Sequence, residues 1–356
     1  MNISFTFSYP LQSNISNLKK MNYLKQIVLT LLLLFCATTM RAVDVVFTTD
    51  EGVNHTSAIE NAERNLAKLL TEINRAQEAN EDVSVKNMAM DEFSKKSLVR
   101  IWAVTPFYCD DDEVVDRLWI FKNGTMMASH IPLIITPKDE DFGNGTYQEA
   151  VVEFDRSGNI TDFRFALDAQ TAESMERCGD VASKEQRMII LQYVERFRTA
   201  YNQKDINTIE KMFSDDALII TGKVIIARQG TDQFSFKPKV QYTKQNKAQY
   251  ISNLRRAFLR NKWIDIKFSQ IGENGETSGC SGITRSRKNK NMFGVRMRQS
   301  WKSSNYSDEG YLFLLWEFPE NGGDPIIHVR TWQPEYVGGQ RQKPDESITT
   351  LGGFDL

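Results

Sequence analysis

FGVRMRQSWK (residues 293–302), YLFLLWEF (311–318) and PIIHVRTW (325–332) are the three segments that decide the fold. Each has the length and the content of aromatic and branched residues that are typical of a β-strand. The middle segment is apolar on both faces, so it predicts a central strand that is covered on both sides. Together the three segments predict an antiparallel meander.

Side chains of a strand point to opposite faces with period two, which sorts these residues into faces. In the first segment, one face is formed by Val295, Met297, Gln299 and Trp301, and the other by Arg296, Arg298, Ser300 and Lys302. In the third segment, one face is formed by His328, Arg330 and Trp332, and the other by Ile327, Val329 and Thr331. Polar groups among large aromatic side chains on a curved sheet predict a cup that holds a ligand.

Apolar periodicity along the rest of the chain predicts an α+β protein with helices laid against antiparallel sheets. We expect helices near 56–80, 85–95, 184–202, 205–213 and 247–260. Further strands are expected near 98–105, 114–122, 125–136, 147–155, 161–167, 217–222 and 264–271. A polar loop is expected to run from the strand at 217–222 to Tyr242.

The order of these elements divides the chain of 356 residues into two domains of ordinary size. The predicted parts are a signal peptide at 1–42, an N-terminal α+β domain at 43–178, a linker at 179–184, a cone-shaped domain at 185–335 and a tail at 336–356. In both halves, helices are followed by an antiparallel meander. It therefore stays open whether the first domain is a divergent copy of the second.

The N-terminus has the features of a secretory signal. Lys25 precedes the apolar run 27–35, small residues follow up to Ala42, and Met21 is an alternative start. We expect an exported protein, periplasmic or secreted, cleaved after Ala42. Attachment of a lipid to Cys36 is the alternative, which the bulky residue before it disfavours. No second apolar run approaches the length of a membrane span, so no transmembrane segment is expected.

Cysteines and charge runs point to no metal or cofactor. Cys109, Cys178 and Cys280 lack the spacing of a zinc site, and we prefer three unpaired buried thiols over one disulfide bond. The acidic run 110–113 lacks the spaced ligands of a calcium loop and is interpreted as a solvated turn. The basic run 285–290 is interpreted as a solvated hairpin loop, so no nucleic-acid partner is expected.

Charge is distributed unevenly between the halves. Residues 43–184 carry 14 basic and 27 acidic side chains, whereas residues 185–335 carry 24 basic and 16 acidic ones. Opposite charges favour attraction between the two halves, an interpretation that we prefer over a basic surface for an anionic ligand.

Residues 185–335 resemble the nuclear-transport-factor-2-like superfamily, the cone-shaped α+β fold of polyketide cyclases and ketosteroid isomerases. The resemblance rests on the helix around 193–198, the turn at 201–205, the segment 212–217 and the final meander. The runs 305–316 and 327–334 are similar to a subgroup of exported proteins of Bacteroidetes bacteria of unknown function. The resemblance implies a fold and not an activity.

Enzymes of this superfamily that move protons use a carboxylate base in a dry cup, which implies candidate residues here. Asp215 or Asp216 is the candidate base, Tyr311 the candidate oxyanion donor, and His328 the candidate second acid or base. The same residues also have explanations without catalysis: the two aspartates form a turn or cap a helix, Tyr311 packs in its strand, and His328 makes a structural hydrogen bond. We prefer these structural explanations, so a cyclase-like or isomerase-like enzyme is the alternative function.

Ligand binding is the preferred function. The expected ligand-binding residues are His328, Arg330, Trp332, Trp301, Tyr311 and Arg298. Arginines that face the cup would bind a carboxylate or a phosphate by paired hydrogen bonds, and the indoles would stack on a planar ring or a sugar. A cross-strand ion pair between Arg330 and Glu317 explains this arginine without a ligand, and for Arg330 we prefer that explanation. The expected partners are a small molecule, a glycan or a protein, and a homodimer is left open. A purely structural protein whose cup is filled by its own side chains is the third alternative.

Overall fold

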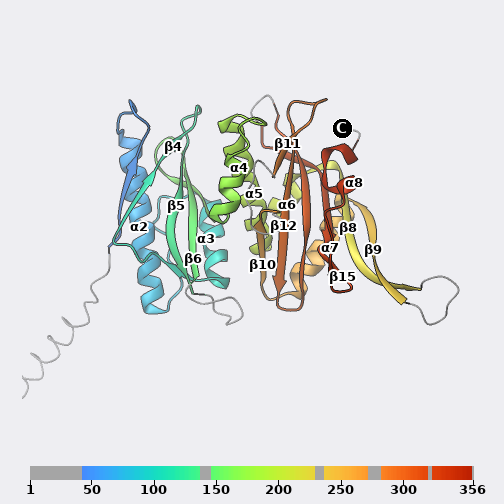
Figure 1. The fold of residues 1–356 in the computed structure, drawn as a ribbon. Helices are drawn as coiled ribbons and strands as arrows, with labels where there is room; N and C mark the ends of the chain where they lie inside the picture. The colour runs from blue at the N-terminus through green and yellow to red at the C-terminus, as the bar shows by residue number, and fades with distance from the viewer. Residues whose placement is uncertain (1–41, 137–145, 229–235, 272–281, 320–322, 355–356) are drawn as a thin grey trace, which may run out of the picture. The chain divides into compact units, whose positions relative to one another are not determined.

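A computed structural model describes residues 42–136, 146–228, 236–271, 282–319 and 323–354 (Figure 1). Residues Val43–Leu356 form one compact unit. The predicted signal segment, with Met21 and Cys36, lies outside the described residues apart from Ala42. Within the described residues, no helix has the length and apolar character needed to cross a membrane.

The first half combines helices with a five-stranded antiparallel sheet. That sheet has the order β2-β5-β6-β7, with β4 also paired to β5. Its strands are β2 (Phe107–Tyr108), β4 (Trp119–Ile120), β5 (Met126–Ile135), β6 (Thr146–Phe154) and β7 (Ile160–Phe165). A separate parallel pair is formed by β1 (Asp44–Thr48) and β3 (Glu113–Arg117). The helices are α2 (Ser57–Ala79), α3 (Glu92–Val104) and α4 (Ala169–Glu176).

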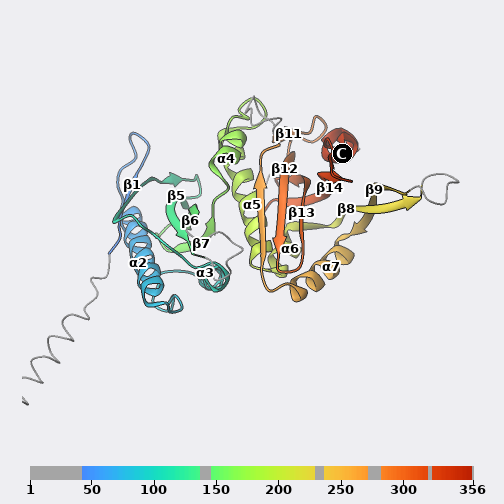
Figure 2. The same ribbon diagram turned by 60° about the horizontal axis from the view of Figure 1, so that its bottom comes forward.

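The second half is built on a seven-stranded sheet with the order β10-β12-β13-β14-β8-β9, and β11 pairs with β12. Its strands are β8 (Phe213–Arg228), β9 (Phe236–Asn246), β10 (Ile264–Ser269), β11 (Ile283–Arg285), β12 (Met292–Ser303), β13 (Ser307–Glu317) and β14 (Ile326–Pro334). The helices α5 (Lys184–Asn202), α6 (Ile206–Met212) and α7 (Lys247–Arg260) lie against it (Figure 2). The predicted α+β class and the predicted meander are confirmed.

Helix α5 begins at a capping box, in which Ser183 accepts from the Gln186 amide and the Gln186 side chain accepts from Ser183. Such a box satisfies two amides that the helix itself leaves unpaired. The apolar side of α5 buries Phe197 and Tyr201 in the core of the second half, where Phe197 also packs on Trp316. Helix α5 is therefore a main support of the sheet that carries the candidate site.

Ion pairs join side chains of the two halves. Arg164 on β7 contacts Glu195 on α5, and Arg196 on α5 contacts Glu153 on β6. Glu185 at the start of α5 contacts Lys122. These contacts accord with attraction between halves of opposite net charge, although the boundaries of the two predicted domains stay a prediction.

Two predicted segments are wrong. Residues 98–104 belong to helix α3, not to a strand, because Asp91 caps the helix and Leu98, Ile101 and Trp102 are buried on one side of it. The expected polar loop before Tyr242 is largely the antiparallel ribbon β8–β9. Polar residues are tolerated in it because both faces of the ribbon reach solvent, with Lys223, Lys239 and Ile226 exposed.

The C-terminal tail is also folded, although it was predicted only as a tail. It contains β15 (Tyr336–Val337), β16 (Gln340–Arg341), α8 (Glu346–Thr349) and a short 3-10 helix (Leu351–Gly353). Phe354 stacks on Phe313 at a ring distance of 5.8 Å, and Leu351 packs on the same cluster. The tail thus covers the outer face of β13, which confirms that this strand is covered on both sides.

The cysteines differ from the preferred prediction of three unpaired thiols. Cys178 is disulfide-bonded, whereas Cys109 is a free and buried thiol. Spacing cannot reveal such a bond, because disulfide partners are brought together only by the fold. Cys280 lies outside the described residues.

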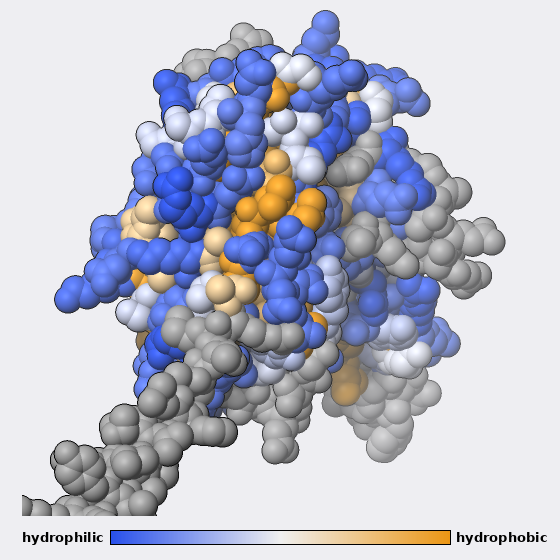
Figure 3. Space-filling model, turned by 90° about the vertical axis from the view of Figure 1, so that its left-hand side faces the viewer, coloured by the Kyte–Doolittle hydropathy of each residue, from blue (hydrophilic) through white to orange (hydrophobic). Residues whose placement is uncertain are grey.

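Figure 3 shows the side of the molecule that carries β1, where apolar residues form a small area within a largely hydrophilic surface. Val46 on β1 and Val115 on β3 are register partners, and both are exposed. Scattered exposed valines are common on protein surfaces, so this area carries no functional argument.

Candidate functional site

The inner face of the second sheet and helix α7 border an open cavity of about 790 Å³, which we call the cup. Trp301, Asp308, Arg330 and Trp332 line it from strands β12, β13 and β14. Helix α7 closes one side through the residues Tyr250, Asn253, Leu254, Ala257 and Arg260. A cavity of this size is in the range of pockets that hold small ligands.

Register explains why these strand residues meet. Trp301 lies opposite Asp308, and Leu312 lies opposite Trp332. Because directly opposed residues share a face of the sheet, the polar groups at 308 and 330 lie in the same concave surface as the two indoles. The cup is therefore lined by alternate positions of three neighbouring strands.

Three polar atoms of the cup residues are buried without a hydrogen-bond partner. They are the Nε of Arg330, the Nε1 of Trp332 and the Oδ1 of Asp308. Among the described residues only two other side chains, Arg187 and Trp316, have such an atom. An unsatisfied buried polar group costs about 1–3 kcal/mol. Three of these five atoms belong to side chains that line one cavity, which makes the cup the strongest candidate for a binding site.

The guanidinium of Arg330 is the central cation of the cup. Its side chain is 5% exposed and lies 5.2 Å from the ring centre of Tyr250. Burial lowers the pKa of Arg330, but Tyr250, Tyr201 and Asp308 raise it more, so the group stays charged. The phenols of Tyr201 and Tyr250 are 2.6 Å apart and hold each other in place behind it.

Asp308 is the acidic group of the cup. Burial raises the pKa of its carboxyl to about 6, although the hydrogen bond from Tyr306 and the charge of Arg330 act in the opposite direction. Near neutral pH the cup therefore holds the cations of Arg330 and Arg260 and the carboxylate of Asp308, and protonation of Asp308 makes the site more positive.

Gly310 allows Trp332 to approach the neighbouring strand. A Cβ atom at Gly310 would lie 2.3 Å from the carbonyl oxygen of Gln333 and 2.7 Å from the indole of Trp332. Real side chains do not make contacts that short, so only glycine fits there without a shift of the cup wall.

The structure divides the residues that were predicted to bind a ligand. Trp301, Arg330 and Trp332 line the cup. Arg298 and Tyr311 lie on the outer face of the sheet: Arg298 pairs with Glu309 and Glu335, and the Tyr311 hydroxyl donates to the Gln342 carbonyl at 2.8 Å. Alternation explains this division, because Arg298 and Tyr311 are register partners on the face opposite to Leu312.

His328 does not share a face with Arg330 and Trp332. The register shifts between Ile327 and Val329, so Ile327 joins the inner core whereas Val329 joins the outer cluster. A bulge of this kind takes up one residue and breaks the period of two. His328 instead contacts Glu317 through Nε2 at 2.7 Å. The preferred prediction for Arg330, an ion pair with Glu317, is therefore wrong.

The predicted catalytic group is not assembled in the cup. Asp215 and Asp216 have exposed side chains, and Asp215 pairs with Lys247 at 2.8 Å. Asp216 accepts a hydrogen bond from Ser214, which helps to lower its pKa. None of Asp215, Asp216, His328 and Tyr311 lines the cup.

Asp308, Tyr306 and Tyr250 are cup residues that sequence reasoning missed. Strand β13 begins at Ser307, four residues before the predicted start at Tyr311. Alternation backwards from Leu314 and Leu312 through Gly310 reaches Asp308, so a longer predicted strand would have placed this carboxylate in the cup.

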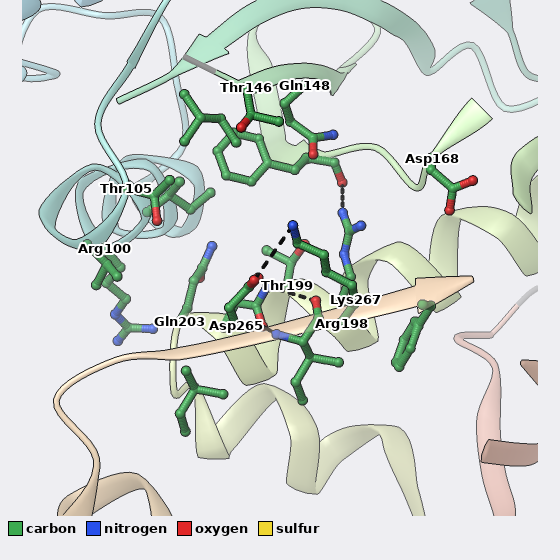
Figure 4. A pocket seen from close by; sticks show the side chains of 18 of the residues that line it. Arg100, Thr105, Thr146, Gln148, Asp168, Arg198, Thr199, Gln203, Asp265 and Lys267 are labelled. Atoms are coloured by element: carbon green, nitrogen blue, oxygen red, sulfur yellow. Dashed lines mark hydrogen bonds and ion pairs between the residues drawn. The ribbon is translucent and has the colours of Figure 1, made fainter. Parts of the chain in front are cut away.

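A second cavity, of about 270 Å³, lies between α3, α5, β6 and β10 (Figure 4). Its polar groups are largely occupied within the protein. Arg198 donates to the carbonyls of Phe165 and Ala166, and the Asn202 side chain binds the backbone of Ile266. Burial raises the pKa of Asp265, which lies 3.9 Å from Lys267. This cavity offers fewer free groups to a ligand than the cup does.

Within the described part of the chain, no three His, Cys, Asp or Glu side chains are arranged to hold a metal ion. Comparisons with known proteins give no matching family model and no matching curated protein. Solved structures with partial similarity are found at TM-scores of about 0.3.

One is a nuclear-transport-factor-2-like protein of Pseudomonas putida, with 13% identity over 44% of this chain and 94% of that chain, and a TM-score of 0.30. Another is a putative aromatic ring hydroxylase of Novosphingobium aromaticivorans, with 12% identity over 45% and 96%, and a TM-score of 0.29. A protein of Bdellovibrio bacteriovorus has 15% identity and a TM-score of 0.29, and the match spans only 41% of its length and 42% of this chain. Similarity at this level does not indicate a function. The fold is therefore described from the strand order and pairing of the two main sheets alone.

Proposed function

We propose that this chain is an exported, non-catalytic protein that binds a small molecule or a glycan in the cup. The observation that carries the proposal is the group of unpaired buried atoms on Arg330, Trp332 and Asp308 around one cavity. A bound ligand would satisfy these atoms and so recover free energy that the empty protein lacks.

Two alternatives receive less support. An enzyme built on Asp215 or Asp216 with His328 would need these side chains in one water-poor pocket, whereas the two aspartates are exposed. A structural protein with a filled cup would leave no room, whereas the cavity holds about 790 Å³. Binding of a partner protein, homodimer formation and membership of the Bacteroidetes subgroup stay predictions.

Export is proposed from the signal-like N-terminus, and the disulfide bond of Cys178 supports it. Disulfide bonds persist mainly in oxidising compartments. Mass determination of the protein recovered from its own cells tests export: we expect a chain that begins at Val43. A chain that retains Met1 or Met21 would contradict the proposal, and a lipid on Cys36 would establish the alternative anchor.

A thermal-shift screen of metabolites and glycans tests binding in the cup. Ala257 lines the cup on α7, so Ala257→Trp should fill the cavity and abolish the shift caused by any genuine ligand. Ser252→Trp is the matched control, because Ser252 is exposed on the same helix and does not line the cup.

The expected result is a compound that stabilises the wild type and the Ser252→Trp protein but not the Ala257→Trp protein. Hits that stabilise all three proteins equally would show that binding occurs elsewhere. The proposed function would be contradicted if no compound in the screen gave a thermal shift that the Ala257→Trp substitution removes.

A further inference from the structure

We infer that the ligand of the cup is a planar organic acid, whose carboxylate is held by Arg330 and Trp332 and whose ring lies between aromatic walls. This inference rests on the proposed function and deepens it. The proposed function allows any small molecule or glycan as the ligand, whereas this inference predicts that the cup binds an acid in preference to a neutral compound.

Arg330 supplies the charge that favours an acid over a neutral ligand. Its side chain is almost fully buried, yet it forms no ion pair with a carboxylate within the described residues; its neighbours are the phenols of Tyr201 and Tyr250, and Asp308 acts on it through charge. Arginines elsewhere in the sheet differ in this respect, since Arg298 contacts two carboxylates. A buried guanidinium without a close counter-ion is costly, and a carboxylate is the group whose two oxygens match its N–H fork.

The second donor lies on the same strand. Trp332 is two residues after Arg330 and shares its face, and its indole N–H is also buried and unpaired. Two donors on one wall favour a ligand group that accepts more than one hydrogen bond. A carboxylate does so with both oxygens, and its charge is also attracted by the arginine.

Asp308 adds selectivity for a second polar group on the ligand. Its Oδ1 is unpaired, so it would accept from a hydroxyl or an amine of the ligand near neutral pH. A free acid without such a donor would instead meet repulsion from this carboxylate. A hydroxylated acid therefore fits the polar groups of the cup better than an unsubstituted acid does.

Aromatic walls favour a planar body for the ligand. The rings of Trp301, Trp332, Tyr250 and Tyr306 line the cavity together with the apolar side chain of Leu254. Flat rings stack on such surfaces, and burial of their apolar area supplies affinity that a small charged group alone lacks. The size of the cavity, its aromatic walls and its hydrogen-bond donors thus all favour a planar organic acid.

Matched pairs of acid and primary amide test the inference, because the two members differ mainly in charge. The probes are 4-hydroxybenzoate, 4-hydroxycinnamate and 6-hydroxy-2-naphthoate, each compared with its amide by isothermal titration calorimetry at pH 7. We expect the wild type to bind at least one acid about tenfold more tightly than the matching amide. Arg330→Gln should remove this preference while affinity for the amide changes by less than about threefold.

Arg296→Gln is the matched control, since Arg296 lies on β12 in the same sheet and faces away from the cup. It should keep the preference for the acid. If Arg330→Gln fails to fold, Trp332→Phe removes only the indole N–H and should weaken binding of the acid by about threefold to tenfold.

Three results would overturn the inference. They are equal affinity for acid and amide, a preference that survives Arg330→Gln, and no binding of any acid up to about 10 mM. If neutral compounds or glycans still give shifts that Ala257→Trp abolishes, the proposed function stands and only the ligand class is wrong. If those shifts are absent as well, both proposals fail.

Discussion

At the scale of single residues, Asp308 links the cup to the stability of the fold. Its carboxyl has a folded pKa of about 6, above its ordinary value of 3.8. A raised carboxyl pKa means that the folded state holds its proton more tightly than the unfolded state does. Stability is therefore highest below pH 4 as far as this group is concerned, and it falls as pH rises from about 4 to about 6.

Asp308→Asn should accordingly stabilise the protein at pH 7.5. A shift of about two pKa units corresponds to roughly 3 kcal/mol, so we expect a gain of about 1–3 kcal/mol after the lost charge interaction with Arg330 is allowed for. Urea unfolding at pH 7.5 and pH 4.5 measures the effect, which should fall to about a third at the lower pH, because a carboxyl with the ordinary pKa of 3.8 is still mostly ionised there in the unfolded chain. Equal changes at both pH values would contradict the account of Asp308.

At the scale of secondary-structure elements, strand β9 forms an edge of the second sheet. Its exposed side chains include Lys237, Lys239 and Lys244. Unpaired strand edges invite pairing with other chains, and lysines on an edge strand oppose such pairing. These lysines therefore oppose pairing of β9 with other chains. The same polar residues led the sequence to predict a loop here.

The double variant Lys237→Val with Lys239→Val should self-associate. Light scattering coupled to size-exclusion chromatography at increasing protein concentration would reveal the growth in mass. Lys302→Val is the control, because Lys302 is exposed on β12, which is paired on both sides at this residue. A double variant that keeps the mass of the wild type would contradict the role assigned to this edge.

The same elements show how far the sequence predicts the fold and the site. Strands β12 and β13 were predictable because Val295, Met297 and Trp301 alternate cleanly and Leu312 and Leu314 are apolar. The face of β14 was only partly predictable, since the bulge before Val329 depends on how β8 and β13 pair with it. Period-two reasoning cannot foresee such a bulge, so it placed His328 in the cup.

Pairing with distant segments also explains the other errors. The sequence did not predict that the C-terminal tail covers the sheet, because the tail packs through Phe354 on Phe313, which lies about forty residues earlier in the chain. Tyr250 was known as a buried helix residue, but only the fold shows that its ring contacts Arg330. Local patterns thus predict elements, whereas the site arises from contacts between elements.

At the scale of the whole molecule, Arg164 is the centre of a buried ion network that joins the halves. Its guanidinium contacts Glu153, Asp162 and Glu195, and Glu195 also accepts a hydrogen bond from the Leu167 amide. Removal of Arg164 takes the ion-pair partner from buried Glu195 and leaves Glu153 and Asp162 to share Arg196. Breaking a buried ion pair in this way costs about 3–5 kcal/mol.

Arg164→Met should therefore lower the free energy of unfolding by about 3–5 kcal/mol at pH 7. The loss should be smaller at pH 5, where the stranded carboxylates can take up protons. Arg117→Met is the control, because Arg117 pairs with Asp50 at an exposed site, where ion pairs contribute less than about 1 kcal/mol. Similar losses in the two variants would contradict the structural role of the network.

The central claim concerns the cup as a binding site. The most direct test is a crystal structure of the protein soaked with the best compound of the thermal-shift screen. The account predicts ligand density in the cavity, with polar atoms within hydrogen-bond distance of Arg330 Nε and Trp332 Nε1. Density only in the cavity beside Arg198, or a cup that stays empty while the compound binds elsewhere, would contradict it.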